Sequence, residues 1–216
     1  MADAFVAWWR GKPVDCGNTC RRGIVRYLSN GSLAGPPSDA DGGNGALMRN
    51  LPVALATLDE PDKLVEVTLA QAHITHHHPL SDQACVGFAQ WLHRLWREPS
   101  VPRAQALLET LVQPWVQQHP VFRFDPYPGR ASGYVVDTVQ TVLHHVLGTP
   151  DFESAVVGVV NQGDDADTTG ALAGMLAGAI HGVNAIPARW LRKLDPAIRR
   201  AVTDQTSTLL ALRVPA

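Results

Sequence analysis

Asn161-Gln-Gly-Asp-Asp-Ala-Asp-Thr-Thr169 runs directly into 170–182, an apolar segment with a glycine at every fourth position. Each glycine inside a helix costs about 1 kcal/mol relative to alanine, so a row of glycines on one helix predicts very close packing of a second helix. A membrane-spanning helix is less suitable, because the segment is short, carries His181 and follows an acidic cluster. The segment is therefore predicted to be a buried central helix.

The acidic cluster at the start of this helix has two interpretations. Asp164, Asp165 and Asp167 bring three carboxylates close to the hydroxyls of Thr168 and Thr169. Hard oxygen donors at this density repel one another unless a cation neutralises them, which favours a site for Mg²⁺, Ca²⁺ or Mn²⁺. Alternatively, Asp167 or Thr168 caps the helix by accepting hydrogen bonds from its free N–H groups.

Apolar residues recur at helical spacing along most of the chain, most clearly at 86–96, 107–115 and 135–146. A last helix is expected at 203–212, after the start signal Asp195-Pro196. The run 155–160 has the composition of a buried strand, but its helical neighbours favour a helix. The pattern predicts an all-α domain.

Two stretches interrupt the helical pattern, 32–44 and 119–133, and both are rich in glycine or proline. We expect both to be long loops, which in a compact domain are often functional.

Composition narrows the class of protein. The 216 residues are 45% hydrophobic and 18% charged, as in a globular domain with one sizeable core. A formal net charge of −2 argues against an electrostatic nucleic-acid binder. Three cysteines without a CxxC pair, and no pattern of a secretion signal after Met1, predict a cytoplasmic location.

Two further segments are candidates for a binding site. Asn18 or Thr19 can cap a helix that runs to residue 28, which leaves Asp15 without a capping role. Gly42-Gly-Asn-Gly45 is expected to open a helix at 46–49, and the exposed N–H groups of such a start can bind phosphate. The same glycine pattern is also common in plain turns.

Histidines gather at 73–78. His73, His76 and His77 would share one helical face and could hold zinc, but no cysteine or carboxylate with zinc-type spacing lies nearby in the sequence. The favoured interpretation is a surface or partly buried histidine cluster without a metal.

Together these motifs resemble the ADP-ribosylglycohydrolase family. The segment from Asn161, followed by Ile186-Pro187 and Trp190-Leu191, is similar to the C-terminal metal motif of that family. Segments that begin at residues 13, 43, 70, 78, 124 and 134 resemble the branch that removes ADP-ribose from dinitrogenase reductase, the iron protein of nitrogenase. The resemblance covers about residues 8–212, and it implies an orthogonal helical domain with a metal cleft and long loops.

The resemblance also implies an activity and a set of site residues. The implied reaction is hydrolysis of the N-glycosidic bond between ADP-ribose and arginine by two divalent ions, Mn²⁺ or Mg²⁺. The implied partners are ADP-ribosylated dinitrogenase reductase and a nitrogen-signalling protein at the membrane, with no nucleic acid. The residues that match are Asp165, Asp167 and Thr168 as metal ligands, Asp15 as the catalytic acid or base, and Asn18, Gly43, Asn44, Gly45, His76 and Tyr134 as substrate-binding residues.

This sequence departs from the family pattern in two places. Asp164 stands where the family usually has a glycine, and it places an extra carboxylate beside the ligands. The family motifs Gly-Asp-Ala-Leu-Gly and Asp-Asp-Thr-Glu, which supply the other ligands, are missing, and 5–9 looks like the end of a helix. Residues 1–216 are therefore expected to be a single domain, truncated at its N-terminus, with about half of the ligand set.

Three functional hypotheses follow. The first is an ADP-ribosylarginine hydrolase. The second is a catalytically impaired relative that binds ADP-ribose or a nitrogen-regulation partner without turnover. The third is a helical remnant without a retained function.

Overall fold

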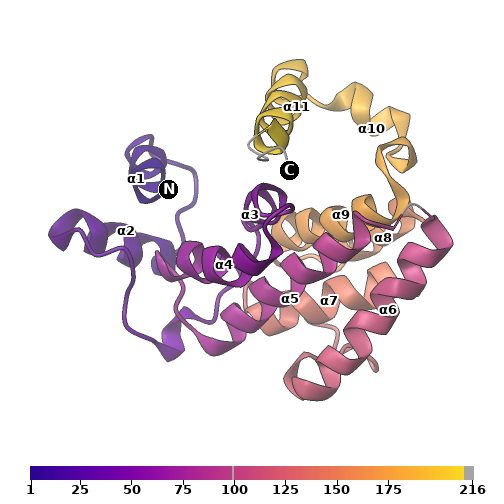
Figure 1. Cartoon of the computed structure of the whole chain (residues 1–216), viewed down its shortest axis with the longest axis horizontal. Helices are drawn as coiled ribbons and strands as arrows, with labels where there is room; N and C mark the ends of the chain where they lie inside the picture. The colour runs from indigo at the N-terminus through magenta and orange to yellow at the C-terminus, as the bar shows by residue number, and fades with distance from the viewer. Residues whose placement is uncertain (99, 212–216) are drawn as a thin grey trace.

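The structure is a computed structural model that describes residues 1–98 and 100–211 (Figure 1). Within these residues the chain is helical and contains no strand, apart from one isolated antiparallel bridge between Gly43 and Tyr134. The predicted all-α class is confirmed. The α-helices are α1 (Ala2–Arg10), α2 (Asn18–Asn30), α3 (Leu51–Ala56), α4 (Leu64–His73), α5 (Pro79–Leu95), α6 (Val101–Gln118), α7 (Val135–Gly148), α8 (Phe152–Val160), α9 (Ala166–His181), α10 (Ala188–Lys193) and α11 (Pro196–Ala211).

The core lies between α5, α6, α7, α8 and α9, which pack side by side in one half of the molecule (Figure 1). The apolar faces predicted on α5, α6 and α7 all contribute to it. Side chains with less than 2% of their surface accessible include Leu95, Leu108, Leu143, Leu172 and Leu176. Burial of such side chains contributes about 1.5–3 kcal/mol each, so this cluster supplies most of the folding energy.

The run 155–160 is part of α8, as its helical neighbours predicted. Asp151 is the N-cap of this helix, and its side chain accepts a hydrogen bond from the Ser154 N–H at 2.8 Å. This cap starts a helix despite the β-branched composition. The helix then packs against α7 and α9.

The predicted close packing of a second helix against the glycines of α9 is confirmed for part of the row. A Cβ on Gly170 would lie 2.9 Å from Val160 Cγ2 of α8, so this position does mark a close helix approach. A Cβ on Gly174 would meet nothing within 4 Å, and Gly182 is the C-cap, at a φ of +77°. The predicted close packing of a second helix is confirmed at Gly170 and, at ordinary van der Waals distance, at Gly178, whose Cβ would lie 3.9 Å from Phe152 of α8; α9 is a packed helix of the core.

Shorter elements lie around the core. The predicted loops at 32–44 and 119–133 are confirmed, with one 3₁₀ turn in each, Asp39–Asp41 and Pro120–Phe122. Helix α11 begins at Pro196, earlier than predicted, and residue 212 of the predicted last helix lies outside the described residues. In Figure 1, α10 and α11 arch away from the core before α11 reaches α3.

None of the helices in the described part of the chain combines the length and hydropathy needed to cross a membrane.

Candidate active site

A hydrogen bond joins the glycine loop to the start of α9, across 121 positions of sequence. Asn44 Nδ2 donates to Asp165 Oδ2 at 2.6 Å and to Thr138 Oγ1 of α7 at 2.8 Å. Asn44 is buried, so water competes weakly for these bonds. A single amide therefore fixes the predicted metal ligand Asp165 relative to two other parts of the fold.

Main-chain hydrogen bonds strengthen this connection. The Asn44 N–H donates to the Gly133 carbonyl at 3.0 Å, and the Asp165 N–H donates to the Ala131 carbonyl at 3.1 Å. Three segments distant in sequence thus form one unit. We call it the loop–α9 junction, and it comprises residues 42–45, 131–134 and 165–168.

The side chains at the start of α9 are not used as caps. Asp165 is the N-cap residue, but its side chain makes no capping hydrogen bond. Asp167 and Thr168 lie within the first turn, so the interpretation of either as the cap is wrong. The Asp165 carboxylate is turned toward Asn44 instead.

The donors at the start of α9 fit a hard divalent cation by their chemistry. Asp165 is partly buried, Asp167 is exposed and Thr168 is buried, which gives two carboxylates and a hydroxyl on one turn. Within the described residues, no further acidic, histidine or cysteine side chain forms a cluster of three with them. Asp164 is exposed and adopts a left-handed φ of +52°.

The glycine loop does not open a helix. Residues 45–49 form a turn, and α3 begins only at Leu51. The turn is held by the Met48 N–H on the Asn44 carbonyl at 3.0 Å and by Arg49 Nη1 on the Gly45 carbonyl at 2.9 Å. The prediction of a helix at 46–49 is therefore wrong, and the helix-start argument for phosphate binding does not apply.

His76 lies against this glycine loop and is 3% accessible. A Cβ on Gly45 would lie 2.7 Å from His76 Cε1, so only glycine permits the approach. His76 Nδ1 hydrogen-bonds to Thr75 Oγ1 at 2.7 Å. Burial, and secondly the charge of Arg49, lower the pKa of His76 to about 4. The imidazole is consequently neutral at neutral pH.

Arg49 is a residue of this region that the sequence analysis missed. Its guanidinium donates to Gln71 Oε1 at 2.9 Å and to Thr75 Oγ1 at 2.7 Å, and it lies 4.7 Å from the Phe5 ring centroid. Arg49 therefore links the end of α4 to the glycine loop. The available signal was the single charge in the stretch 46–56, which is apolar apart from Arg49 and Asn50, since a charge in such a stretch needs partners when it is buried.

Tyr134 is the residue before α7, and its main chain pairs with Gly43. A Cβ on Gly42 would lie 3.1 Å from Tyr134 Cε2, so the ring packs against the glycine loop. The side chain is nevertheless 42% accessible. An exposed ring at this place is compatible with base stacking, which stays a prediction.

Asp15 and Asn18 lie further out. Asp15 is exposed in the connection between α1 and α2, and Asn18 is the exposed first residue of α2. Gly17 is the N-cap of α2 and no side chain caps this end, so the capping interpretation of Asn18 or Thr19 is wrong. Among the described contacts, neither Asp15 nor Asn18 hydrogen-bonds to the loop–α9 junction, although Arg22 of α2 reaches the Ala40 carbonyl at 3.3 Å.

A cavity of about 220 Å³ lies between α1, α2 and the 45–49 turn. Met48 contributes to its wall, and the Thr168 hydroxyl lies 3.7 Å from the sulfur of this methionine. The cavity therefore adjoins the start of α9. Its lining residues are Phe5, Trp8, Cys20, Ile24, Met48, Arg49 and Thr75.

Comparison with known proteins identifies relatives of this chain. Residues 1–215 match the family model described as ADP-ribosylglycohydrolase. The chain is 50% identical over 212 residues to an ADP-ribosyl-[dinitrogen reductase] glycohydrolase of Rhodospirillum rubrum, covering 98% of this chain and 71% of the relative. It is 30% identical to the ADP-ribosylarginine hydrolase Tri1 of Serratia proteamaculans (strain 568), covering 89% of this chain and 56% of Tri1.

A solved structure shows the same fold. It is described as an ADP-ribosylglycohydrolase-related protein complex, and it superposes with a TM-score of 0.82 at 31% identity. The match covers 99% of this chain and 73% of the other. Fold, sequence and family model agree, and the chain belongs to the ADP-ribosylglycohydrolase family of hydrolases.

Proposed function

We propose that this chain hydrolyses the N-glycosidic bond between ADP-ribose and an arginine guanidinium, and that its protein substrate is dinitrogenase reductase. The observation that supports this proposal is the 2.6 Å hydrogen bond from Asn44 to Asp165, which joins one candidate substrate residue to one candidate metal ligand. The arginine linkage and the reductase are supported by the activities after which the relatives are named.

The proposed cofactors are two divalent ions, Mn²⁺ or Mg²⁺, for which this chain offers Asp165, Asp167 and Thr168 as donors. When bound, such ions supply Lewis-acid polarisation of substrate oxygens and lower the pKa of water. The Asn44 amide keeps the Asp165 carboxylate in a defined orientation. The Asn44–Asp165 hydrogen bond is therefore a contribution of this chain's own residues to metal binding.

The remaining residues are proposed to bind ADP-ribose and to move a proton. Hydrolysis adds the hydroxyl of water to the ribose carbon while the C–N bond breaks, and a proton goes to the departing guanidine. Asp15, exposed before α2, is proposed as the acid or base for that proton. The proposed substrate contacts are Asn18, the loop Gly43-Asn44-Gly45, His76 and Tyr134.

The test is turnover of free ADP-ribosylarginine by the 216-residue chain with Mn²⁺, with release of ADP-ribose followed by chromatography. We expect Mn²⁺-dependent release that falls at least roughly tenfold in Asp165→Asn, because a ligand and the Asn44 contact are both weakened. Asp164→Asn is the matched control: it changes an exposed neighbouring carboxylate and should retain parental activity. Equal activity of Asp165→Asn and Asp164→Asn would contradict the proposal.

The alternative function is binding of ADP-ribose without turnover. Calorimetric titration with ADP-ribose distinguishes the two, since binding that is unaffected by a chelator and yields no product favours the alternative. A chain that fails to unfold cooperatively would instead support a helical remnant. The cytoplasmic location and a nitrogen-signalling partner at the membrane stay predictions, without support from the comparisons.

A further inference from the structure

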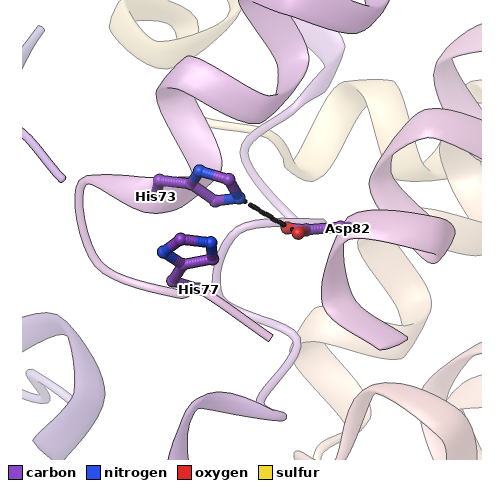
Figure 2. A group of neighbouring side chains, drawn as sticks. All are labelled: His73, His77 and Asp82. Carbon is purple, nitrogen blue, oxygen red and sulfur yellow. Dashed lines mark hydrogen bonds and ion pairs between the residues drawn. The ribbon is translucent and has the colours of Figure 1, made fainter. Parts of the chain in front are cut away.

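Three side chains meet beside the connection 74–78, which joins α4 to α5. His73 ends α4, His77 lies in the connection and Asp82 is in the first turn of α5. One ligand atom from each lies within 4.8 Å of the others. Figure 2 shows the two imidazole rings one above the other, with the Asp82 carboxylate beside them.

The contacts of this His73–His77–Asp82 cluster define which atoms face its centre. His73 Nε2 lies 3.1 and 3.0 Å from the two oxygens of Asp82. His77 Nδ1 lies 2.6 Å from the Gly35 carbonyl, which only accepts hydrogen bonds, so this nitrogen carries the proton. The Nε2 atom of neutral His77 is therefore left with a lone pair, in the arrangement typical of metal-binding histidines.

An ion pair alone explains only part of this geometry. It accounts for His73 and Asp82, which are about one-fifth accessible and so remain reachable from solvent. It gives no reason for the second imidazole, which stacks on His73 with a centroid distance of 3.7 Å and an interplanar angle of 20°. The nearby cation is Arg26. Its guanidinium donates a hydrogen bond to the backbone carbonyl of Ile74 at 2.7 Å, so its charge is directed to the main chain.

We propose that His73, His77 and Asp82 bind one transition-metal ion of the Zn²⁺ class, with solvent in the remaining position. Two imidazole nitrogens and one carboxylate oxygen suit Zn²⁺ or Co²⁺, whereas the all-oxygen donors of α9 suit Mn²⁺ or Mg²⁺. The sequence analysis grouped His76 with His73 and His77 and found no carboxylate. The structure turns His76 to the glycine loop and replaces it with Asp82.

An ion at this place would tie the end of α4 to the first turn of α5. The intervening connection carries His76, the candidate substrate residue that packs on Gly43 and Gly45. The ion would thus act at a distance from the reaction, by fixing one wall of the candidate active site.

The experiment is titration of the 216-residue chain with Co²⁺, followed by the visible absorption of the bound ion, in excess Mg²⁺ to occupy oxygen sites. We expect one Co²⁺ per chain, with affinity at least roughly tenfold lower in His77→Gln and in Asp82→Asn. Gln keeps a donor for the Gly35 carbonyl, and Asn keeps an acceptor for His73. His119→Ala, at a partly buried histidine outside the cluster, is the matched control and should bind as the parent does.

Two results would overturn the proposal. One is parental Co²⁺ affinity in both cluster variants. The other is loss of the Co²⁺ signal in Asp167→Asn, which would place the ion at α9. If the cluster variants fail to fold, chemical modification of histidines in the parent chain tests the site instead. Zn²⁺ should protect His73 and His77 from modification but leave His119 reactive. Equal reactivity of His73 and His77 with and without Zn²⁺ would count against the site. None of these readouts depends on hydrolase activity.

Discussion

At the scale of single residues, Asn44 joins parts of the candidate site that no sequence motif connected. Its Nδ2 atom has two hydrogens, and both are used, one by Thr138 and one by Asp165. A ligand can therefore meet only the Oδ1 atom of this amide. The geometry makes Asn44 a positioning residue for Asp165, while its contact with substrate stays a prediction.

Asn44→Ala should lower the free energy of unfolding by about 1–3 kcal/mol, because a buried hydrogen bond to Thr138 and a partly buried one to Asp165 are lost. Urea denaturation measures this change. Asn184→Ala, at an exposed position in the 3₁₀ turn Val183–Ala185, is the control and should stay within about 0.5 kcal/mol of the parent. Equal stability of the two variants would show that the Asn44 bonds contribute little.

At the scale of helices, α9 contains two glycines whose replacement by alanine should have opposite effects on stability. Gly174→Ala adds a methyl group where nothing lies within 4 Å, so it should raise the free energy of unfolding by up to about 1 kcal/mol through helix propensity. Gly170→Ala places its Cβ 2.9 Å from a stiff valine, and overpacking of this kind costs about 1–3 kcal/mol. Thermal unfolding of both variants should give shifts of opposite sign, and shifts of the same sign would refute the assignment of the α8–α9 contact.

The packing of α5 on α3 predicts a dependence of stability on pH. Buried His93 of α5 donates from Nε2 to the Ala54 carbonyl at 2.7 Å, and its Nδ1 has no partner among the described residues. Burial lowers the pKa of His93 below its usual 6.5, and the Ala54 contact opposes this effect. As the pH drops through the usual pKa of histidine, the unfolded chain takes up a proton at His93 more readily than the folded chain does. The free energy of unfolding therefore falls.

His93→Gln keeps a donor for the Ala54 carbonyl but does not titrate. Its melting temperature should fall less than that of the parent between about pH 7 and about pH 5, where an unperturbed histidine gains its charge. Differential scanning fluorimetry at several pH values measures both proteins. Parallel curves would exclude His93 as a source of the pH dependence.

At the scale of the whole molecule, stability is unevenly distributed. Helices α7 and α9 are central to the core, whereas α11 has no buried residue and leaves Ile198 and Val202 more than half accessible. Local opening requires little loss of buried surface in such a helix. Amide hydrogen exchange should therefore be at least roughly tenfold faster in α11 than in α7 and α9. Similar protection, measured by mass spectrometry of peptides, would mean that α11 opens only with the core.

The sequence by itself determined the main core helices and the family. Helical periodicity is a local property, so it identified the core faces of α5, α6 and α7, and it placed 155–160 in a helix. The motif from Asn161 was specific enough to indicate the ADP-ribosylglycohydrolase family, which the family model confirms.

Only the tertiary structure decided which residues meet. Asn44 reaches Asp165 across 121 positions, and Asp82 replaces His76 beside His73 and His77, because packing of helices brings together side chains with no regular spacing. The turn at 45–49 was missed for the same reason. Contacts to other segments hold it: the Asn44 N–H donates to the Gly133 carbonyl, and the Arg49 guanidinium donates to Gln71 and Thr75. Such contacts override local helix preference.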